Sequence, residues 1–166
     1  MYAISPTVTI DASPEQVWEF LKDVEEWWVA SNPDHESLEV YSDGERIEEG
    51  TRIRVRERIA GIPGVADGEV TEYVPGERLT WEAPKARYRF YGFPLEVDEG
   101  VTWKITPTRG GTELTARVWA SFPDSVLGTI TEWTFEHVLH GVERDYRHAM
   151  RELEYIKRSL EGTAPT

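Results

Sequence analysis

Ser125 to Leu160 is the stretch that decides the fold, and it reads SVLGTITEWTFEHVLHGVERDYRHAMRELEYIKRSL. At about 100° per residue, its apolar side chains fall on one face of a helix. That face comprises Thr131, Phe135, Val138, Leu139, Val142, Tyr146, Ala149, Leu153, Ile156 and Leu160. Asp124 or Ser125 is placed to cap the start, and Gly162 stands where a helix end favours a left-handed residue. We therefore expect one helix of roughly 50 Å, which needs a broad surface to lie against.

The chain before this helix alternates between apolar and polar residues, as strands do. Residues 2–10 predict a first strand. The segment SPEQ at residues 13–16 then begins a helix with a capping box, and a second short helix is expected at residues 25–29. Further strands are expected at residues 38–41, 51–59, 68–74, 79–83, 101–105 and 114–122. Residues 86–93 fit either a strand or a loop. A run of strands followed by a helix predicts an α+β fold, with an antiparallel sheet packed against the helix.

The composition limits the classes of protein to consider. The formal net charge is −13, which argues against nucleic acid and anionic membrane surfaces as partners. The chain has no cysteine, so disulfides and thiol catalysis are excluded. Residues 1–4 lack the basic and apolar regions of a signal peptide, and no later run is long enough to cross a membrane. We expect a single domain at residues 1–162, a disordered tail at 163–166 and a cytoplasmic location. The acidic charge is also compatible with a host that lives at high salt.

Four motifs resemble one known superfamily. They are VTIDASPEQVWEFLKD at residues 8–23, VTEYVPGERLTW at 70–81, GTELT at 111–115 and ELEYIKRSLE at 152–161. Together they are similar to START-like helix-grip (SRPBCC) proteins, which include polyketide cyclases and plant allergen-type lipid binders. The resemblance implies a curved antiparallel β-sheet wrapped around a long C-terminal helix, with two short helices after the first strand. A twisted sheet around one helix leaves a gap unless large side chains fill it, and this gap is the expected site.

Three functions stay open. The first is binding of a hydrophobic small molecule, such as a lipid or polyketide, through aromatic contacts. The second, implied by the resemblance, is a polyketide cyclase or dehydratase that works without a cofactor. The third is a partner-binding module with no ligand pocket. An inward carboxylate paired with a tyrosine or arginine would favour the enzyme, a cavity of hydrocarbon alone would favour the carrier, and a filled interior would favour the partner-binding module.

Glu57 is the first candidate catalytic residue. In the strand at residues 51–59, Ile53, Val55, Glu57 and Ile59 face one way and four arginines face the other. If that register holds, the Glu57 carboxylate points into apolar surroundings, which raise a carboxyl pKa and suit a general acid or base. The alternative is a carboxylate at the rim of the sheet that reaches water or an arginine.

The segment RYRFY at residues 87–91 supplies the other catalytic candidates, Tyr88 and Arg89. In an extended chain, Tyr88 and Phe90 face away from the neighbouring arginines. Tyr88 or Arg89 at the mouth of a pocket could stabilise an enolate or hold a ligand carboxylate. The related aromatase/cyclases use such polar groups to orient a polyketone. The alternative is a solvated strand face with the aromatic rings packed under the helix.

Aromatic side chains are the main candidates for ligand contacts. Each of them could equally fill a core, but at least two are expected to touch a pocket. The candidate ligand-binding residues are Trp28, Val55, Tyr73, Trp81, Phe90, Trp103, Thr131, Phe135 and Leu139. Trp119 belongs to the same aromatic set.

His137 and His140 are three residues apart beside Glu136, a spacing that metal ligands use. Both project from the polar face of the expected helix, however, and the sequence places no third ligand. We therefore expect no metal and no other cofactor. Trp133 lies on the same face, so this side of the helix could also form a contact between subunits of a homodimer.

Overall fold

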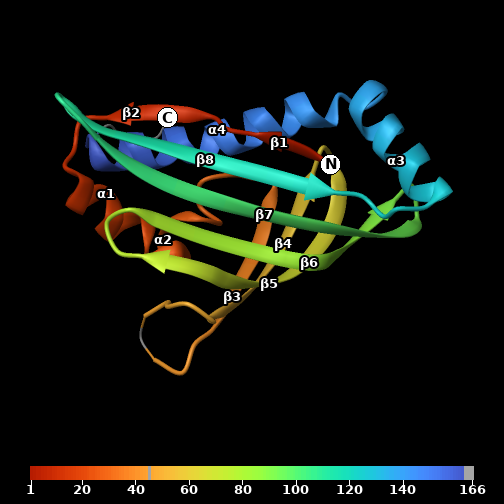
Figure 1. The fold of residues 1–166 in the computed structure, drawn as a ribbon, viewed down its shortest axis with the longest axis horizontal. Helices are drawn as coiled ribbons and strands as arrows, with labels where there is room; N and C mark the ends of the chain where they lie inside the picture. The colour runs from red at the N-terminus through yellow and green to blue at the C-terminus, as the bar shows by residue number, and fades with distance from the viewer. Residues whose placement is uncertain (45, 163–166) are drawn as a thin grey trace.

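The computed structural model describes residues 1–44 and 46–162 (Figure 1). Within these ranges, eight strands form one antiparallel sheet in the order β1-β8-β7-β6-β5-β4-β3, with β2 also paired to β8. The strands are β1 (Tyr2–Ile4), β2 (Thr7–Ile10), β3 (His35–Tyr41), β4 (Arg52–Ile59), β5 (Ile62–Val74), β6 (Arg78–Phe90), β7 (Phe93–Thr108) and β8 (Gly111–Ser121). The helices are α1 (Pro14–Leu21), α2 (Val24–Trp27), α3 (Val126–His137) and α4 (Gly141–Leu160). The predicted tail at 163–166 lies outside the described residues.

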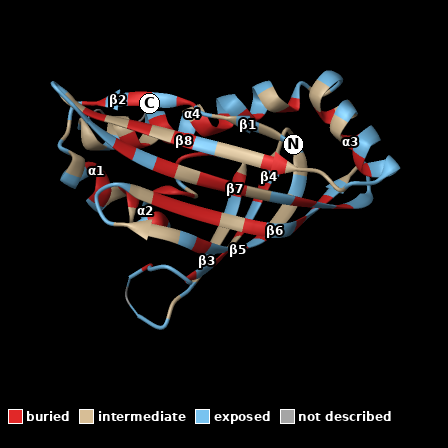
Figure 2. Ribbon diagram, in the orientation of Figure 1, coloured by how far each residue is buried: buried red, intermediate tan, exposed pale blue. Residues whose placement is uncertain are grey.

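The sheet curves around α4, and the other helices close its ends. α4 runs along the inner side of the sheet, α1 and α2 lie at one end, and α3 lies at the other (Figure 1). α4 contacts β1, β2, β4 and β8. Buried residues dominate long stretches of β6 and β7 (Figure 2). The predicted α+β helix-grip fold is confirmed. No helix among the described residues is long and apolar enough to span a membrane.

The expected first strand at residues 2–10 is in fact two strands. Pro6 lies between β1 and β2, and both strands pair with β8. Proline has no backbone N–H to donate, so the ladder is interrupted there. Its carbonyl still accepts from the Ala116 N–H, with 3.0 Å between N and O. α1 begins as predicted, because Ser13 and Gln16 exchange the two hydrogen bonds of a capping box.

The prediction of a single long helix at residues 125–160 is wrong. The structure has two helices, and the chain turns sharply just before Gly141. His140 adopts the left-handed backbone conformation, with a φ of 51°. A Cβ on Gly141 would lie 2.4 Å from the Phe135 ring, so only glycine allows this close approach. α3 therefore leaves the line of α4 and packs Phe135 against Phe122, with 5.5 Å between the ring centroids.

The break also changes which side chains are buried. Val138 and Tyr146, expected on the apolar face, are 55% and 43% exposed. Ala149, Leu153 and Ile156 are buried as expected. The face of α4 that meets the sheet is rotated away from Tyr146, and its polar members are Asp145, His148 and Glu152.

Residues 86–93 extend the sheet. β6 continues to Phe90, and a turn at Tyr91 and Gly92, both with positive φ, leads into β7. β4 keeps the predicted register, so Glu57 points inward and is only 9% exposed. The structure therefore brings an acidic side chain from β4 and three polar side chains from α4 into the same interior.

Candidate functional site

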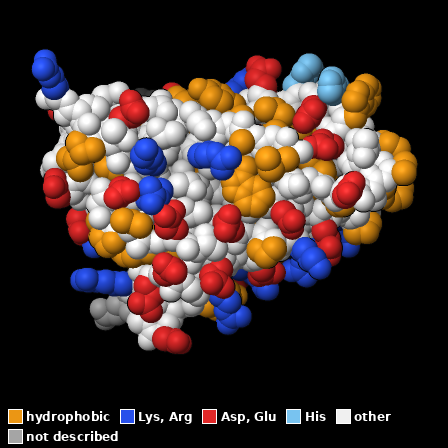
Figure 3. Space-filling view, in the orientation of Figure 1, with side chains coloured by type: hydrophobic (Ala, Val, Ile, Leu, Met, Phe, Trp, Pro, Cys, Tyr) orange, Lys and Arg blue, Asp and Glu red, His pale blue; other side chains and the backbone are white. Residues whose placement is uncertain are grey.

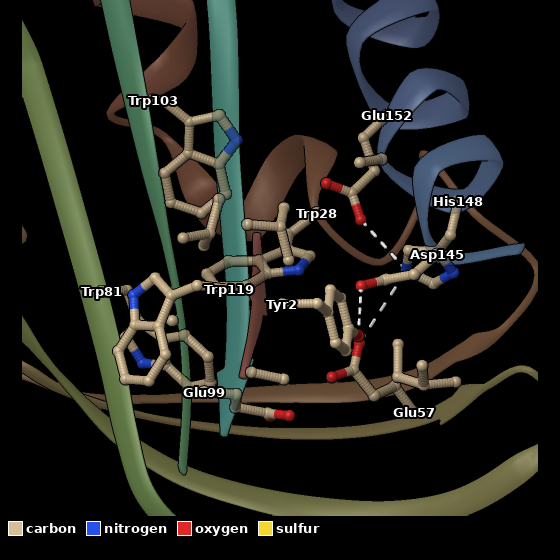
Figure 4. Close-up of a pocket in the computed structure, with 16 residues that line it drawn as sticks. Tyr2, Trp28, Glu57, Trp81, Glu99, Trp103, Trp119, Asp145, His148 and Glu152 are labelled. Carbon is tan, nitrogen blue, oxygen red and sulfur yellow. Dashed lines mark hydrogen bonds and ion pairs between the residues drawn. The ribbon is translucent and has the colours of Figure 1, made fainter. Parts of the chain in front are cut away.

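A cavity of about 70 Å³ lies between α4 and the sheet (Figure 4). One side of it is aromatic and the other is largely polar (Figure 4). The aromatic residues are Trp28, Trp81, Trp103 and Trp119. The polar and ionisable residues are Tyr2, Glu57, Glu99, Asp145, His148 and Glu152. A cavity built in this way can bind a flat apolar group on one side and an oxygen-bearing group on the other.

The polar side chains of α4 share one face because of their spacing. Asp145, His148 and Glu152 stand at positions i, i+3 and i+7, on the same side as Ala149 and Leu153. Their exposed fractions are 4%, 8% and 6%, respectively. Burial of ionisable groups is costly unless they are paired. Each of the three has a partner on another element.

Two histidines and two glutamates meet beside the cavity, and we call His35, Glu57, His148 and Glu152 the His–Glu cluster. His35 begins β3 and lies opposite Glu57 of β4 in the ladder. Its Nε2 atom lies 2.9 Å from His148 Nε2, 3.3 Å from Glu57 Oε2 and 3.2 Å from Glu152 Oε1. His148 Nε2 is also 3.2 Å from Glu152 Oε1.

The charges of the His–Glu cluster support one another. Burial alone would lower the pKa of His35, but Glu152 and Glu57 outweigh it and raise that pKa to about 10. Burial alone would raise the pKa of Glu152, but the two histidines lower it to about 2. The pKa of His148 is also raised, by Glu152 and Glu57 against the effect of burial. The cluster is therefore held as a network of ion pairs.

Two tyrosine–carboxylate pairs also face the interior. Tyr2 donates its hydroxyl to Asp145 Oδ2, and Tyr88 donates to Glu99 Oε2, each over 2.7 Å. Burial raises the pKa of Asp145 to about 6. Burial and the nearby charge of Glu57 raise the pKa of Glu99 well above the usual carboxyl range. Near neutral pH, Asp145 can therefore accept a proton and Glu99 can donate one.

Three buried polar atoms around the cavity make no hydrogen bond within the described residues. They are Nε1 of Trp81, Nε1 of Trp103 and Oε1 of Glu99. Buried polar groups almost always have a partner, so a water molecule or a ligand group is expected at these atoms. The three residues all line the cavity, which identifies its wall as the place where such a group would bind.

A second, smaller cavity adjoins the first and has a volume of about 30 Å³. It shares Tyr2, Ile59, Glu99 and Ala120 with the first cavity and is otherwise mainly apolar. Phe135 of α3 forms part of its wall. The two cavities thus meet at these four residues, of which Tyr2 and Glu99 are polar, and α3 covers the apolar end.

The structure brings seven of the sequence-predicted site residues to these cavities. Glu57, Trp28, Trp81 and Trp103 line the first, and Tyr88, Phe90 and Phe135 line the second. Of the alternatives left open for Glu57 and Tyr88, the structure has both side chains buried, and Tyr88 is paired with Glu99 rather than with Glu57.

Five other predicted residues lie away from both cavities. Val55 is fully buried in the core, and Tyr73 packs against Trp18 with 5.1 Å between ring centroids. The Thr131 hydroxyl donates to a carbonyl of its own helix. Leu139 lies in the turn between α3 and α4, and Arg89 is exposed on the outer side of β6. The remaining histidine pair is also outside the cavities, and His137 stacks on Trp133.

Several residues of the site were missed in the sequence. Glu99 had a usable signal, because it precedes Val101 and Trp103 on the same face of a strand. The spacing of Asp145, His148 and Glu152 also places them on one face of a helix. A search for an apolar face does not select charged residues, so this signal was not used. Tyr2 and His35 had no local signal, because their partners lie far away in the chain.

Comparisons with known proteins agree with this architecture. The sequence profile of the family described as "Polyketide cyclase / dehydrase and lipid transport" matches residues 1–155. Protein TTHA0849 from Thermus thermophilus is similar in structure, with a TM-score of 0.72 and 18% identity over 99% of this chain and 100% of the other. The search of curated proteins gave no match.

Two further solved structures carry descriptive names. The Zhui aromatase/cyclase from Streptomyces sp. R1128 has a TM-score of 0.70 and 17% identity over 96% of this chain and 93% of its own. A START superfamily protein from Mycobacterium smegmatis has a TM-score of 0.67 and 18% identity over 96% and 99% of the two chains. At such identities the likeness shows the fold, while the family profile covers nearly the whole chain. The chain thus belongs to the polyketide cyclase / dehydrase and lipid transport family.

Proposed function

We propose that the protein binds a small molecule with an apolar part and a carbonyl or hydroxyl group, and catalyses proton transfer on it as a dehydratase or cyclase does. The observation that carries this proposal is the pair of tyrosine–carboxylate hydrogen bonds beside one cavity, Tyr2 with Asp145 and Tyr88 with Glu99. A simple carrier needs no ionisable groups in its interior, and burying them is costly. Acid–base catalysis gives those groups a use.

The two carboxyl groups have different roles in this proposal. Asp145, whose pKa of about 6 lies close to neutral pH, removes a proton from the carbon beside a carbonyl group. Glu99, whose pKa is raised well above the usual range, is the protonated group that delivers a proton to a departing hydroxyl. In a dehydration the C–H and C–O bonds break, a C=C bond forms and water leaves. The different environments of Asp145 and Glu99 give their carboxyl groups different pKa values, so that one can accept a proton while the other donates one.

The size of the cavities limits the substrate. The larger cavity holds about 70 Å³, well below the roughly 300–1,000 Å³ typical of sites for drug-sized ligands. We therefore assign it to the reactive end of the ligand. The apolar remainder extends into the second cavity under Phe135, so that α3 must shift when a longer ligand enters.

The carrier is the second candidate, and the tryptophan wall of the cavity favours it. A partner-binding module is favoured less, because the interior is not filled. α3 nevertheless exposes Val126, Leu127, Ile130 and Trp133, and apolar side chains gather at that end of the molecule (Figure 3). A carrier would bind ligand without changing it, which a turnover assay distinguishes.

The test uses 4-hydroxy-4-phenylbutan-2-one, a β-hydroxy ketone whose loss of water gives a conjugated product with strong ultraviolet absorption. We expect the protein to accelerate this loss, and Glu99→Gln and Asp145→Asn each to slow it by roughly 10²–10⁴-fold. Glu96→Gln is the matched control, because Glu96 is exposed on the same strand. Native mass spectrometry of protein purified from its own host would identify a bound molecule. Binding with no turnover would leave only the carrier, and full activity of both variants would exclude Asp145 and Glu99 as the catalytic groups.

A further inference from the structure

We propose that the His–Glu cluster is a binding site for a divalent transition-metal ion of the zinc class. Its four side chains come from three elements, β3, β4 and α4, and their nitrogen and oxygen atoms converge. One ligand atom from each of His35, Glu57 and His148 lies within 4.8 Å of the others. Glu152 adds an oxygen that contacts both histidines. Imidazole nitrogen and carboxylate oxygen are the ligands that zinc takes in proteins besides thiolate.

The distances between these atoms suit a bound ion. Ligand atoms placed 2.0–2.2 Å from a metal at angles of 90–109° lie roughly 2.8–3.6 Å apart. The His35–His148 separation is 2.9 Å, and both histidines are 3.2 Å from Glu152 Oε1. Glu57 Oε2 lies 3.3 Å from one Nε2 and 4.0 Å from the other. Small side-chain adjustments would place all four around one ion.

The outer nitrogens of the histidines are oriented as in metal sites. His35 Nδ1 lies 2.6 Å from the Trp28 carbonyl oxygen, which can only accept, so Nδ1 carries a proton. In the neutral ring, Nε2 then keeps its lone pair and directs it at the cluster. His148 Nδ1 faces Asp34 Oδ2 at 3.7 Å, a longer contact of the same kind. Proteins fix metal-binding histidines through such partners.

The arrangement requires a cation at its centre. Two Nε2 lone pairs 2.9 Å apart, between two carboxylates, repel one another unless a proton or a metal ion lies between them. Protons on the histidines can supply this charge, whereas a metal ion would contact all four groups at once. The cluster also borders the cavity through Glu57, His148 and Glu152. An ion there could take a ligand oxygen as an additional partner. The inference is independent of the proposed function, because an ion can be held without any turnover.

The chain offers an internal control for a binding experiment, because its four histidines form two pairs. The whole protein is stripped with EDTA, exchanged into buffer and titrated with ZnCl₂ in a calorimeter. We expect one-to-one binding in the wild type and in the double variant His137→Ala/His140→Ala. His148→Gln should weaken binding by more than about 100-fold, because loss of a partner that only orients a ligand already costs 10–100-fold. If the His137→Ala/His140→Ala variant loses zinc binding and His148→Gln keeps it, the proposal is wrong.

Wild-type protein provides a readout that does not depend on whether His148→Gln folds. Imidazole ¹⁵N spectra report the protonation and metal binding of each ring nitrogen, and the double variant identifies the His137 and His140 signals. Addition of ZnCl₂ should move both Nε2 signals of the remaining pair to the metal-bound range and raise the thermal unfolding temperature. If His35 stays doubly protonated at millimolar ZnCl₂, the cluster holds protons only and the inference is wrong.

Discussion

His35 Nε2 and His148 Nε2 lie 2.9 Å apart in the interior, although 113 residues separate them in the chain. The contact joins β3 at one edge of the sheet to α4, and Glu57 and Glu152 flank it. Much of the remaining packing of α4 on the sheet is apolar and uses Ala149, Leu153 and Ile156. At the His–Glu cluster the packing is charged. Ionisable side chains therefore occupy positions where a purely structural core would have apolar side chains such as leucine.

Removing one member of the His–Glu cluster should be costly to the fold. In metal-free protein, Glu152→Gln leaves two buried histidines without their shared carboxylate. We expect a loss of about 3–5 kcal/mol in the free energy of unfolding. Glu154→Gln, on the exposed side of the same helix, should change it by less than about 0.5 kcal/mol. Urea unfolding followed by tryptophan fluorescence measures both. Equal small effects would mean that the cluster is solvated rather than buried.

Asp145 should make stability depend on pH. Burial raises its pKa from 3.8 to about 6 in the folded protein, so folding favours the protonated form. Its contribution is fully present below pH 3.8 and is lost as the pH rises through 6. Over that window the loss amounts to about 3 kcal/mol. The groups that face it are Tyr2, Glu57, His148 and Glu152.

Asp145→Asn is the variant that isolates this contribution. Relative to wild type, its free energy of unfolding should rise by roughly 2–3 kcal/mol between about pH 4 and about pH 7, because the amide does not ionise. Urea unfolding of both proteins at the two pH values gives the difference. A difference that is the same at both pH values would contradict the raised pKa.

Tyr2 should hold the pKa of Asp145 down. Its hydroxyl donates to Asp145 Oδ2, which stabilises the charged carboxylate against burial. Tyr2→Phe should therefore raise the Asp145 pKa above 6 and cost about 1–3 kcal/mol at neutral pH, because a buried acceptor loses its donor. A carboxyl ¹³C titration measures the pKa. Tyr146→Phe is the control. Tyr146 follows Asp145 in α4 and is 43% exposed, so this change should leave the Asp145 titration unchanged.

Local patterns were enough to predict most of the fold. Strand alternation correctly grouped Glu57 with Ile53 and Val55 and separated Tyr88 from the neighbouring arginines, and the capping box at Ser13 correctly began α1. These features depend on neighbours in the chain. The site depends on contacts between distant segments, such as Tyr2 with Asp145, and no local pattern encodes such pairs. Charged residues on the inner face of α4 were also hidden, because amphipathic analysis assigns charge to the solvent side.

The helix break was missed for a related reason. The apolar stripe continues through Val138 and Leu139, so periodicity alone predicts one helix. What breaks it is a tertiary contact, the Phe135 ring against Gly141. Glycine lowers helix propensity by only about 1 kcal/mol, which is too little to end a helix without that contact.

Gly141→Ala tests this explanation of the break, because two effects oppose each other. Alanine is the better helix former by about 1 kcal/mol, whereas its methyl group would lie 2.4 Å from the Phe135 ring. The clash should cost about 1–3 kcal/mol and prevail, so we expect a net loss of stability. Gly110→Ala is the matched control, because nothing lies within 4 Å of a Cβ at that position. Phe135→Leu in the same chain should relieve the clash, so the double variant should be more stable than the sum of the two single changes implies. A Gly141→Ala protein more stable than wild type would show that helix propensity, and not the Phe135 contact, decides where α4 begins.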